Sequence, residues 1–184
     1  MTLCHRRRVT NLCLAARSAV IASLLLASFV AGAQKIPETN ASTLAGNVVH
    51  LPLDLRGKIG VLVLGFSKKS SEQCHSWDEG ISRDFGSNAH TAYYQMPVLE
   101  DVPGLIRSMV IHSMRSDIPA ATQVRFVPLL RNELEWKSVA EFGPGDDAYV
   151  LIVNDAGEVK WRGHGPLTPA SYATFKSTLT AMEK

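Results

Sequence analysis

Cys74 is the residue whose type and position could carry chemistry, because it lies near the start of a predicted helix. A cysteine in the first turn of a helix can be activated as a thiolate, since the helix dipole and exposed amides stabilise negative charge there. Ser71 stands three residues earlier, at the spacing where a second cysteine would complete a dithiol pair. A serine hydroxyl cannot carry out thiol–disulfide exchange, and the charge of Glu72 disfavours a neighbouring thiolate. The pattern therefore argues against dithiol redox chemistry.

A single cysteine leaves two interpretations open. We interpret Cys74 as a small core residue on the apolar side of its helix, because free cysteines are among the most buried residues. The alternative is a reactive thiol in a one-cysteine enzyme, either peroxiredoxin-like or a thiol-dependent reductase. The two interpretations differ in one observable property, because a core cysteine resists thiol reagents until the protein unfolds.

A metal-handling site built on Cys74, His75 and His164 is a third hypothesis. Copper delivery by a site of this kind needs two sulfur ligands and a distal histidine, and only one sulfur is present here. We therefore interpret both histidines as ordinary solvent-exposed residues. The sequence predicts no metal site and no cofactor.

Two further residues are candidates for binding a partner. Lys68 would place positive charge beside a helix N-terminus, where an acidic group of a partner could dock, although a solvated turn is the simpler interpretation. Trp161 could anchor a partner, because tryptophan is enriched in interface hot spots. Packing against the sheet is the simpler interpretation of Trp161, because large aromatic side chains are usually buried.

Residues 1–33 have the pattern of a cleaved secretory signal peptide. Four arginines precede an apolar run over residues 18–30, and small residues at Ala31 and Ala33 suit a signal-peptidase site. The apolar run is shorter than the ~20 residues that span a bilayer, so we expect no stable membrane span after cleavage. The sequence thus predicts a periplasmic or secreted protein.

Loss of this leader changes the charge and the cysteine count. Four of the 19 basic residues lie in it, which leaves 15 basic against 17 acidic residues, a net charge of −2. Cys4 and Cys13 also lie in the leader, so Cys74 becomes the single cysteine of the mature chain. No basic stripe with interleaved aromatic residues remains, and a nucleic-acid partner is not expected.

The elements that would position these residues follow an α/β pattern. Residues 34–46 are polar and predict a flexible lead-in, followed by one domain over residues 47–184. Alternation, apolar runs and capping residues predict strands near residues 48–53, 59–66, 91–98, 125–130, 149–154 and 159–163, with helices near 70–85, 102–115, 132–142 and 168–182. In the 102–115 helix, Leu105, Ile106, Met109, Val110 and Ser113 share one face, and His112 near this face is predicted to be a partly buried packing residue.

This order, a βαβ unit followed by a β-hairpin and a C-terminal helix, resembles the thioredoxin-like fold. In detail the chain is similar to the thioredoxin-like assembly factors of mitochondrial ATP synthase and their bacterial homologues. The short matches are Leu55-Arg56-Gly57-Lys58, Phe66-Ser67-Lys68, Ser76-Trp77, Gly157-Glu158-Val159-Lys160-Trp161, Gly163 and Gly165-Pro166. The resemblance implies a central mixed β-sheet flanked by helices, and a protein that assists the assembly or handling of other proteins without a redox pair.

The resemblance also identifies what a redox member would need. Ser71 falls at the position of the attacking cysteine, and Ala148 falls where redox members place a cis-proline. The strand over residues 59–66 holds no carboxylate that could accept a proton. These absences agree with one another and predict a non-catalytic protein-binding or assembly factor.

Overall fold

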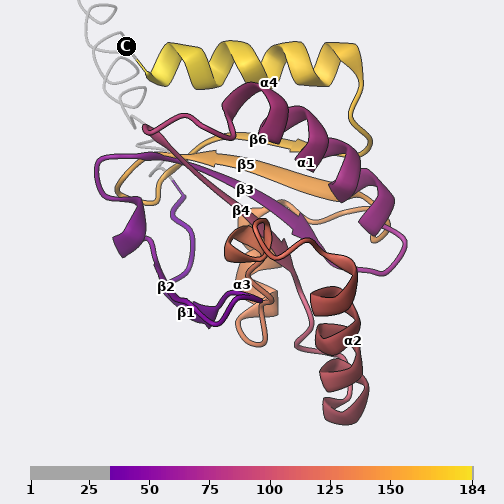
Figure 1. Ribbon diagram of the computed structural model, residues 1–184. Coiled ribbons are helices and arrows are strands. Elements are labelled where there is room, and N and C mark those ends of the chain that lie inside the picture. Colours follow the sequence, from indigo (N-terminus) through magenta and orange to yellow (C-terminus); the bar gives the residue numbers. More distant parts are fainter. Residues whose placement is uncertain (1–33, 184) are drawn as a thin grey trace, which may run out of the picture. The chain divides into compact units, whose positions relative to one another are not determined.

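The computed structural model describes residues 34–183, so the predicted signal peptide lies outside the described residues. Its centre is a four-stranded sheet in the order β4-β3-β5-β6, formed by β3 (Ile59–Gly65), β4 (Thr91–Pro97), β5 (Ala148–Val153) and β6 (Val159–His164). β3 pairs parallel with β4 and antiparallel with β5, and β5 pairs antiparallel with β6. This is the mixed sheet with a C-terminal hairpin that the sequence predicts (Figure 1).

β3 is apolar on both faces because both faces of the sheet are covered. Val61 and Val63 belong to the core on one side, while Leu62 and Leu64 belong to the core on the other. All four side chains are buried. β3 therefore fixes the loop that follows it, which leads from Gly65 into the helix that carries Cys74.

Helices α1 (Ser71–Phe85) and α4 (Pro169–Met182) cover the first face of the sheet (Figure 1). Their buried side chains include Trp77 and Phe175, whose rings meet edge to face with centroids 5.7 Å apart. α4 begins with a capping box, in which the hydroxyl of Thr168 and the side chain of Ser171 satisfy each other's backbone N–H groups. The two helices thus form one layer that holds α1 firmly on the sheet.

The second face is covered by a hairpin and a short helix. The hairpin joins β1 (Thr39–Ser42) to β2 (Val48–Leu51), and is followed by the 3₁₀ turn η1 (Leu53–Leu55). The helix is α3 (Glu133–Val139), whose Trp136 is fully buried. Hairpin and helix belong to one apolar cluster with this face of the sheet.

The prediction of a flexible lead-in over residues 34–46 differs from the structure. This segment contains β1 and buries Ile36 and Leu44, and Lys35 forms an isolated bridge with Glu158. Its few apolar residues are too widely spaced to show a strand pattern. Pairing with β2, which sequence periodicity does not reveal, is what orders β1.

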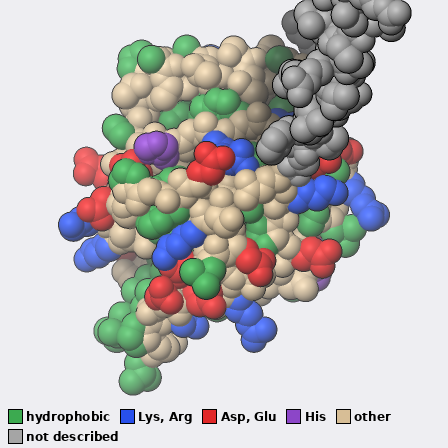
Figure 2. Space-filling model, turned by 180° about the vertical axis from the view of Figure 1, so that it is seen from behind, with side chains coloured by type: hydrophobic (Ala, Val, Ile, Leu, Met, Phe, Trp, Pro, Cys, Tyr) green, Lys and Arg blue, Asp and Glu red, His purple; other side chains and the backbone are tan. Residues whose placement is uncertain are grey.

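Helix α2 (Gly104–Asp117) does not pack as predicted. None of its residues is buried, and Leu105, Ile106 and Met109 are more than half exposed. Figure 2 shows hydrophobic side chains gathered over this projecting helix. β1, β2 and α3 cover the second face of the sheet, and no residue of α2 belongs to the apolar cluster there. None of the helices described between residues 34 and 183 has the length and apolar character needed to cross a membrane.

After α2, the 3₁₀ turn η2 (Gln123–Arg125) leads into an extended segment, residues 126–130, as the sequence predicts. Two isolated bridges, Gln95↔Phe126 and Val98↔Leu129, join it in parallel to the edge of β4 and the residue that follows it. The segment therefore extends the sheet beyond β4 and approaches β1.

We expect Gly157→Ala to destabilise the fold. Gly157 has φ +76°, and a Cβ there would lie 2.7 Å from Cβ of Pro52. Gly57 is a matched control, because it has φ +72° and no atom within 4 Å of the added Cβ. Gly57→Ala is expected to lose about 1–2 kcal/mol of unfolding free energy through backbone strain, and Gly157→Ala about 1–3 kcal/mol more through overpacking. Urea unfolding of both variants measures the difference, and equal losses would contradict the packing argument.

Candidate functional site

The loop between β3 and α1 is closed by hydrogen bonds to the loop before β5. The Ser67 hydroxyl and the Lys69 ammonium both donate to the carboxylate of Asp146, over 3.1 and 3.2 Å. The backbone N–H of Ser70 donates to the hydroxyl oxygen of Ser67 over 3.2 Å. These contacts tie the start of α1 to the loop over residues 143–147.

The thiol of Cys74 is buried between α1 and the end of β3. Its side chain is 8% exposed, and Sγ donates to the carbonyl oxygen of Leu64 over 3.7 Å. Burial raises the pKa of the thiol to about 11, while a hydrogen bond with the Ser70 side chain acts in the opposite direction and is weaker. The site therefore favours the neutral thiol over the thiolate.

Ser71 lies one turn before Cys74 and is exposed. Its hydroxyl donates to the carbonyl oxygen of Lys68 over 2.6 Å, a contact within the loop itself. Cys74 is the one free cysteine among residues 34–183. The helix start thus presents a hydroxyl to solvent and keeps its sulfur inside.

Ala148, at the start of β5, has both backbone groups occupied. Its N–H donates to Oε1 of Gln73 over 3.1 Å, and its carbonyl oxygen accepts from the N–H of Gly165 over 2.9 Å. Neither group is available to an extended peptide at this position. Sequence reasoning missed the role of Gln73, because its partner lies 75 residues further along the chain.

Gln73→Leu is expected to cost about 1–3 kcal/mol of unfolding free energy, because it leaves the buried N–H of Ala148 without an acceptor. Gln73→Glu is the matched control, since a carboxylate oxygen of equal reach keeps the acceptor. Thermal unfolding compares the two variants. A loss in Gln73→Glu as large as in Gln73→Leu would contradict this role for the side-chain oxygen.

The structure does not bring Cys74, His75 and His164 together as a metal site. His75 is exposed and lies with Nε2 3.4 Å from the carboxylate of Glu79. Nδ1 of His164 lies 2.8 Å from the carboxylate of Asp147, and its ring stacks on Tyr149. No group of three histidine, cysteine or acidic side chains that could hold a metal ion occurs in the described part of the chain.

The two partner-binding candidates lie in different settings. Lys68 is exposed on the loop before α1. Trp161 is half-buried on β6 and packs edge to face against Phe175 of α4, with ring centroids 5.8 Å apart. Its ring lies over Gly163, where an added Cβ would approach to 2.3 Å. Trp161 therefore supports α4 and presents only part of its ring to solvent.

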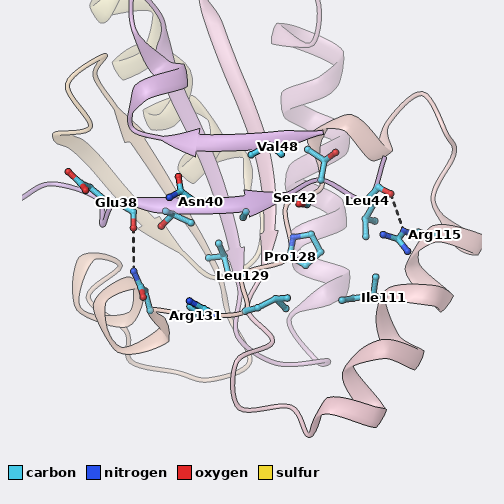
Figure 3. Close-up of a pocket in the computed structure, with 15 residues that line it drawn as sticks. Glu38, Asn40, Ser42, Leu44, Val48, Ile111, Arg115, Pro128, Leu129 and Arg131 are labelled. Atoms are coloured by element: carbon cyan, nitrogen blue, oxygen red, sulfur yellow. Dashed lines mark hydrogen bonds between the residues drawn. The ribbon is translucent and has the colours of Figure 1, made fainter. Parts of the chain in front are cut away.

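A cavity of about 630 Å³ lies on the other side of the molecule, between β1 and residues 128–132 (Figure 3). We call it the β1 groove. Sequence reasoning missed it, because β1 itself was not predicted and the groove forms only where β1 approaches the segment after α2.

Comparison with known proteins finds no matching family model and no matching curated protein. Solved structures do match. A protein from Bacteroides thetaiotaomicron assigned as a protein disulfide isomerase has a TM-score of 0.56 at 14% identity, over 82% of this chain and 88% of the other. One from Aquifex aeolicus assigned as an electron transfer protein has 0.56 at 13%, over 80% and 95%. One from Chlorobium tepidum assigned as the thiol:disulfide interchange protein DsbE has 0.54 at 14%, over 81% and 95%.

The chain has a thioredoxin-like fold. Identities of 13–14% establish this architecture and nothing finer. They give no support to the narrower resemblance to ATP synthase assembly factors.

Proposed function

We propose that this chain is an exported thioredoxin-like protein that binds other polypeptides without thiol redox chemistry. The observation that carries the proposal is made at the start of α1. Ser71 stands where a dithiol pair would have its first cysteine, and the Cys74 thiol is buried with a raised pKa. An assembly or chaperone role in the periplasm, including the role implied by the resemblance to ATP synthase assembly factors, is the narrower form of this proposal.

The surroundings of the α1 start support a binding role over dithiol exchange. A redox member attacks with an exposed thiolate, whereas Ser71 offers only a hydroxyl. The backbone of Ala148, beside this position, is already bonded to Gln73 and Gly165. The described residues thus lack both the attacking sulfur and an open backbone edge next to it.

A one-cysteine reductase is the second candidate. In its favour, the one free cysteine among residues 34–183 lies in α1 beside the loop after β3, and the Ser70 side chain acts to lower the pKa of its thiol against the larger effect of burial. In such an enzyme, a local opening of the loop over residues 66–70 would expose the sulfur to its substrate.

Cys74→Ala tests the proposal. The affinity-tagged full chain and the variant are expressed in an exporting bacterial host and treated with an amine-reactive crosslinker, and the captured proteins are identified by mass spectrometry. We expect the same partners for both, because the proposed binding does not use the thiol. Ser76→Ala, a change at a half-buried residue of the same helix, is the control. Loss of partners in Cys74→Ala, with its melting temperature unchanged, would favour the reductase.

A further inference from the structure

The β1 groove has a backbone edge on each side. On one side, the N–H of Thr43 donates to Asn47 across the hairpin, whereas the N–H of Leu44 donates to Phe126 across the groove. Because backbone groups of alternate residues in a strand point to opposite sides, Asn40 and Ser42 also direct their N–H and C=O groups toward the groove.

The opposite edge is formed by residues 126–130. The N–H groups of Val127 and Leu129 donate to Gln95 and Pro97 at the edge of β4. By the same alternation, the carbonyl of Pro128 and the N–H and C=O groups of Leu130 point into the groove. The groove therefore separates two backbone edges, and neither edge has a neighbouring strand on the side that faces the groove.

These two edges are aligned as antiparallel strands. At one end of the groove the N–H of Leu44 donates to the carbonyl of Phe126 over 2.9 Å. At the other end the side-chain amide of Asn132 donates to the carbonyl of Glu38 over 3.4 Å. The two contacts lie six positions apart on each edge, so in antiparallel register Asn40 is opposite Leu130 and Ser42 is opposite Pro128. Figure 3 shows Ser42 and Pro128 on the two sides of the groove.

Direct pairing of the edges is hindered at its centre. Pro128 has no N–H group and cannot donate to the carbonyl of Ser42. Within residues 34–183, no hydrogen bond joins Asn40 or Ser42 to the backbone of residues 128–131. The edges diverge instead around the cavity of about 630 Å³.

The two ends of the groove differ. The Leu44–Phe126 end is closed by a backbone bond, so an inserted strand cannot continue in the plane of the sheet there. Arg115 of α2 lines this end, where its Nε donates to the carbonyl of Leu44 over 3.1 Å. The other end is bridged only by the Asn132 side chain, which can rotate away. Glu38 and Arg131 lie near that open end, where their charges are of opposite sign.

We propose that the β1 groove binds the extended carboxyl-terminal segment of a partner polypeptide as an added strand between β1 and residues 126–130, with its terminal carboxylate beside Arg115. The unpaired groups on both edges select an extended backbone, because a strand offers donors and acceptors on both of its sides. Because the Leu44–Phe126 bond blocks an inserted strand from continuing in the plane of the sheet, we place the end of the bound chain there. The guanidinium selects the carboxylate over an N-terminal ammonium group.

This inference rests on the proposed function, since it names the kind of polypeptide bound and the surface that binds it. It is tested with a fluorescein-labelled positional-scanning library of hexapeptides with free carboxyl termini, added to the full chain and measured by fluorescence anisotropy. We expect a preferred hexapeptide to bind. Amidation of its terminus or Arg115→Gln should weaken binding by about tenfold or more, because each removes a charge-assisted contact.

Ser42→Pro and Ser42→Ala separate backbone pairing from side-chain contact. Ser42→Pro removes the N–H that faces the groove and should weaken binding about tenfold, whereas Ser42→Ala keeps this N–H and should weaken binding less than Ser42→Pro does. Melting temperatures show whether the variants fold, and the amidated peptide needs no variant. The proposal is overturned if no hexapeptide binds with Kd below ~1 mM, or if binding survives amidation or a folded Ser42→Pro. Failure here, with partner capture by Cys74→Ala intact, would leave the proposed function standing.

Discussion

Cys74 in the folded protein is expected to react with an alkylating reagent at least about a hundredfold more slowly than in protein unfolded by guanidinium chloride at pH 8. Burial raises the pKa of the thiol from 9.0 to about 11, and the thiolate is the reacting form. Two pKa units lower the thiolate fraction by about two orders of magnitude. Shielding by α1 and β3 slows the reaction further.

The pH dependence of alkylation distinguishes the possible states of Cys74. In the folded protein the rate should still rise between pH 9 and pH 11, because the thiol ionises only near its raised pKa. In the unfolded control the rate should be half-maximal at pH ~8.5, the reference pKa of a free cysteine, and level off above about pH 10. A midpoint of the alkylation rate below that reference pKa in the folded protein would contradict a neutral, buried thiol. It would favour the one-cysteine reductase over the binding protein as the function of this chain.

The parts of the fold that sequence predicts are those with a local pattern. β3 is apolar on both faces and α1 carries Trp77 at helical spacing from Cys74, so each is visible within a short window. β1 was missed, because its order depends on pairing with β2 and not on its own composition. The apolar side of α2 was visible in the sequence, but none of its residues is buried, because periodicity does not tell whether a surface remains for a helix to cover.

The candidate site divides in the same way. The residue types of Ser71 and Ala148 can be read from the sequence, and their places relative to a redox centre are what the resemblance implies. The bond from Ala148 to Gln73 and the contact of Asp146 with the loop before α1 join residues more than 70 positions apart. The β1 groove depends on a still longer separation, from Glu38 to Asn132, and on a gap between two edges. Single-sequence patterns carry no information about such distances.

Trp77→Ala is expected to cause the largest loss of stability among the changes considered, about 3–5 kcal/mol of unfolding free energy. Trp77 is fully buried between α1 and α4, and its Nε1–H donates to the carbonyl of Gly165 over 3.0 Å. Gly165 in turn donates to Ala148. One side chain thus connects the helix that carries Cys74 to the loop after β6.

Comparison with Trp136 distinguishes the stability that comes from the hydrogen bond of Trp77 from the stability that comes from its packing. Trp136 is equally buried, but its Nε1 has no hydrogen-bond partner within residues 34–183. Trp77→Phe and Trp136→Phe remove the same atoms, and only the former leaves a carbonyl unpaired. Trp77→Phe should therefore lose about 1–3 kcal/mol more than Trp136→Phe in urea unfolding, because an unpaired buried acceptor keeps its desolvation cost. Equal losses would mean that packing alone holds α1 against the loop at Gly165.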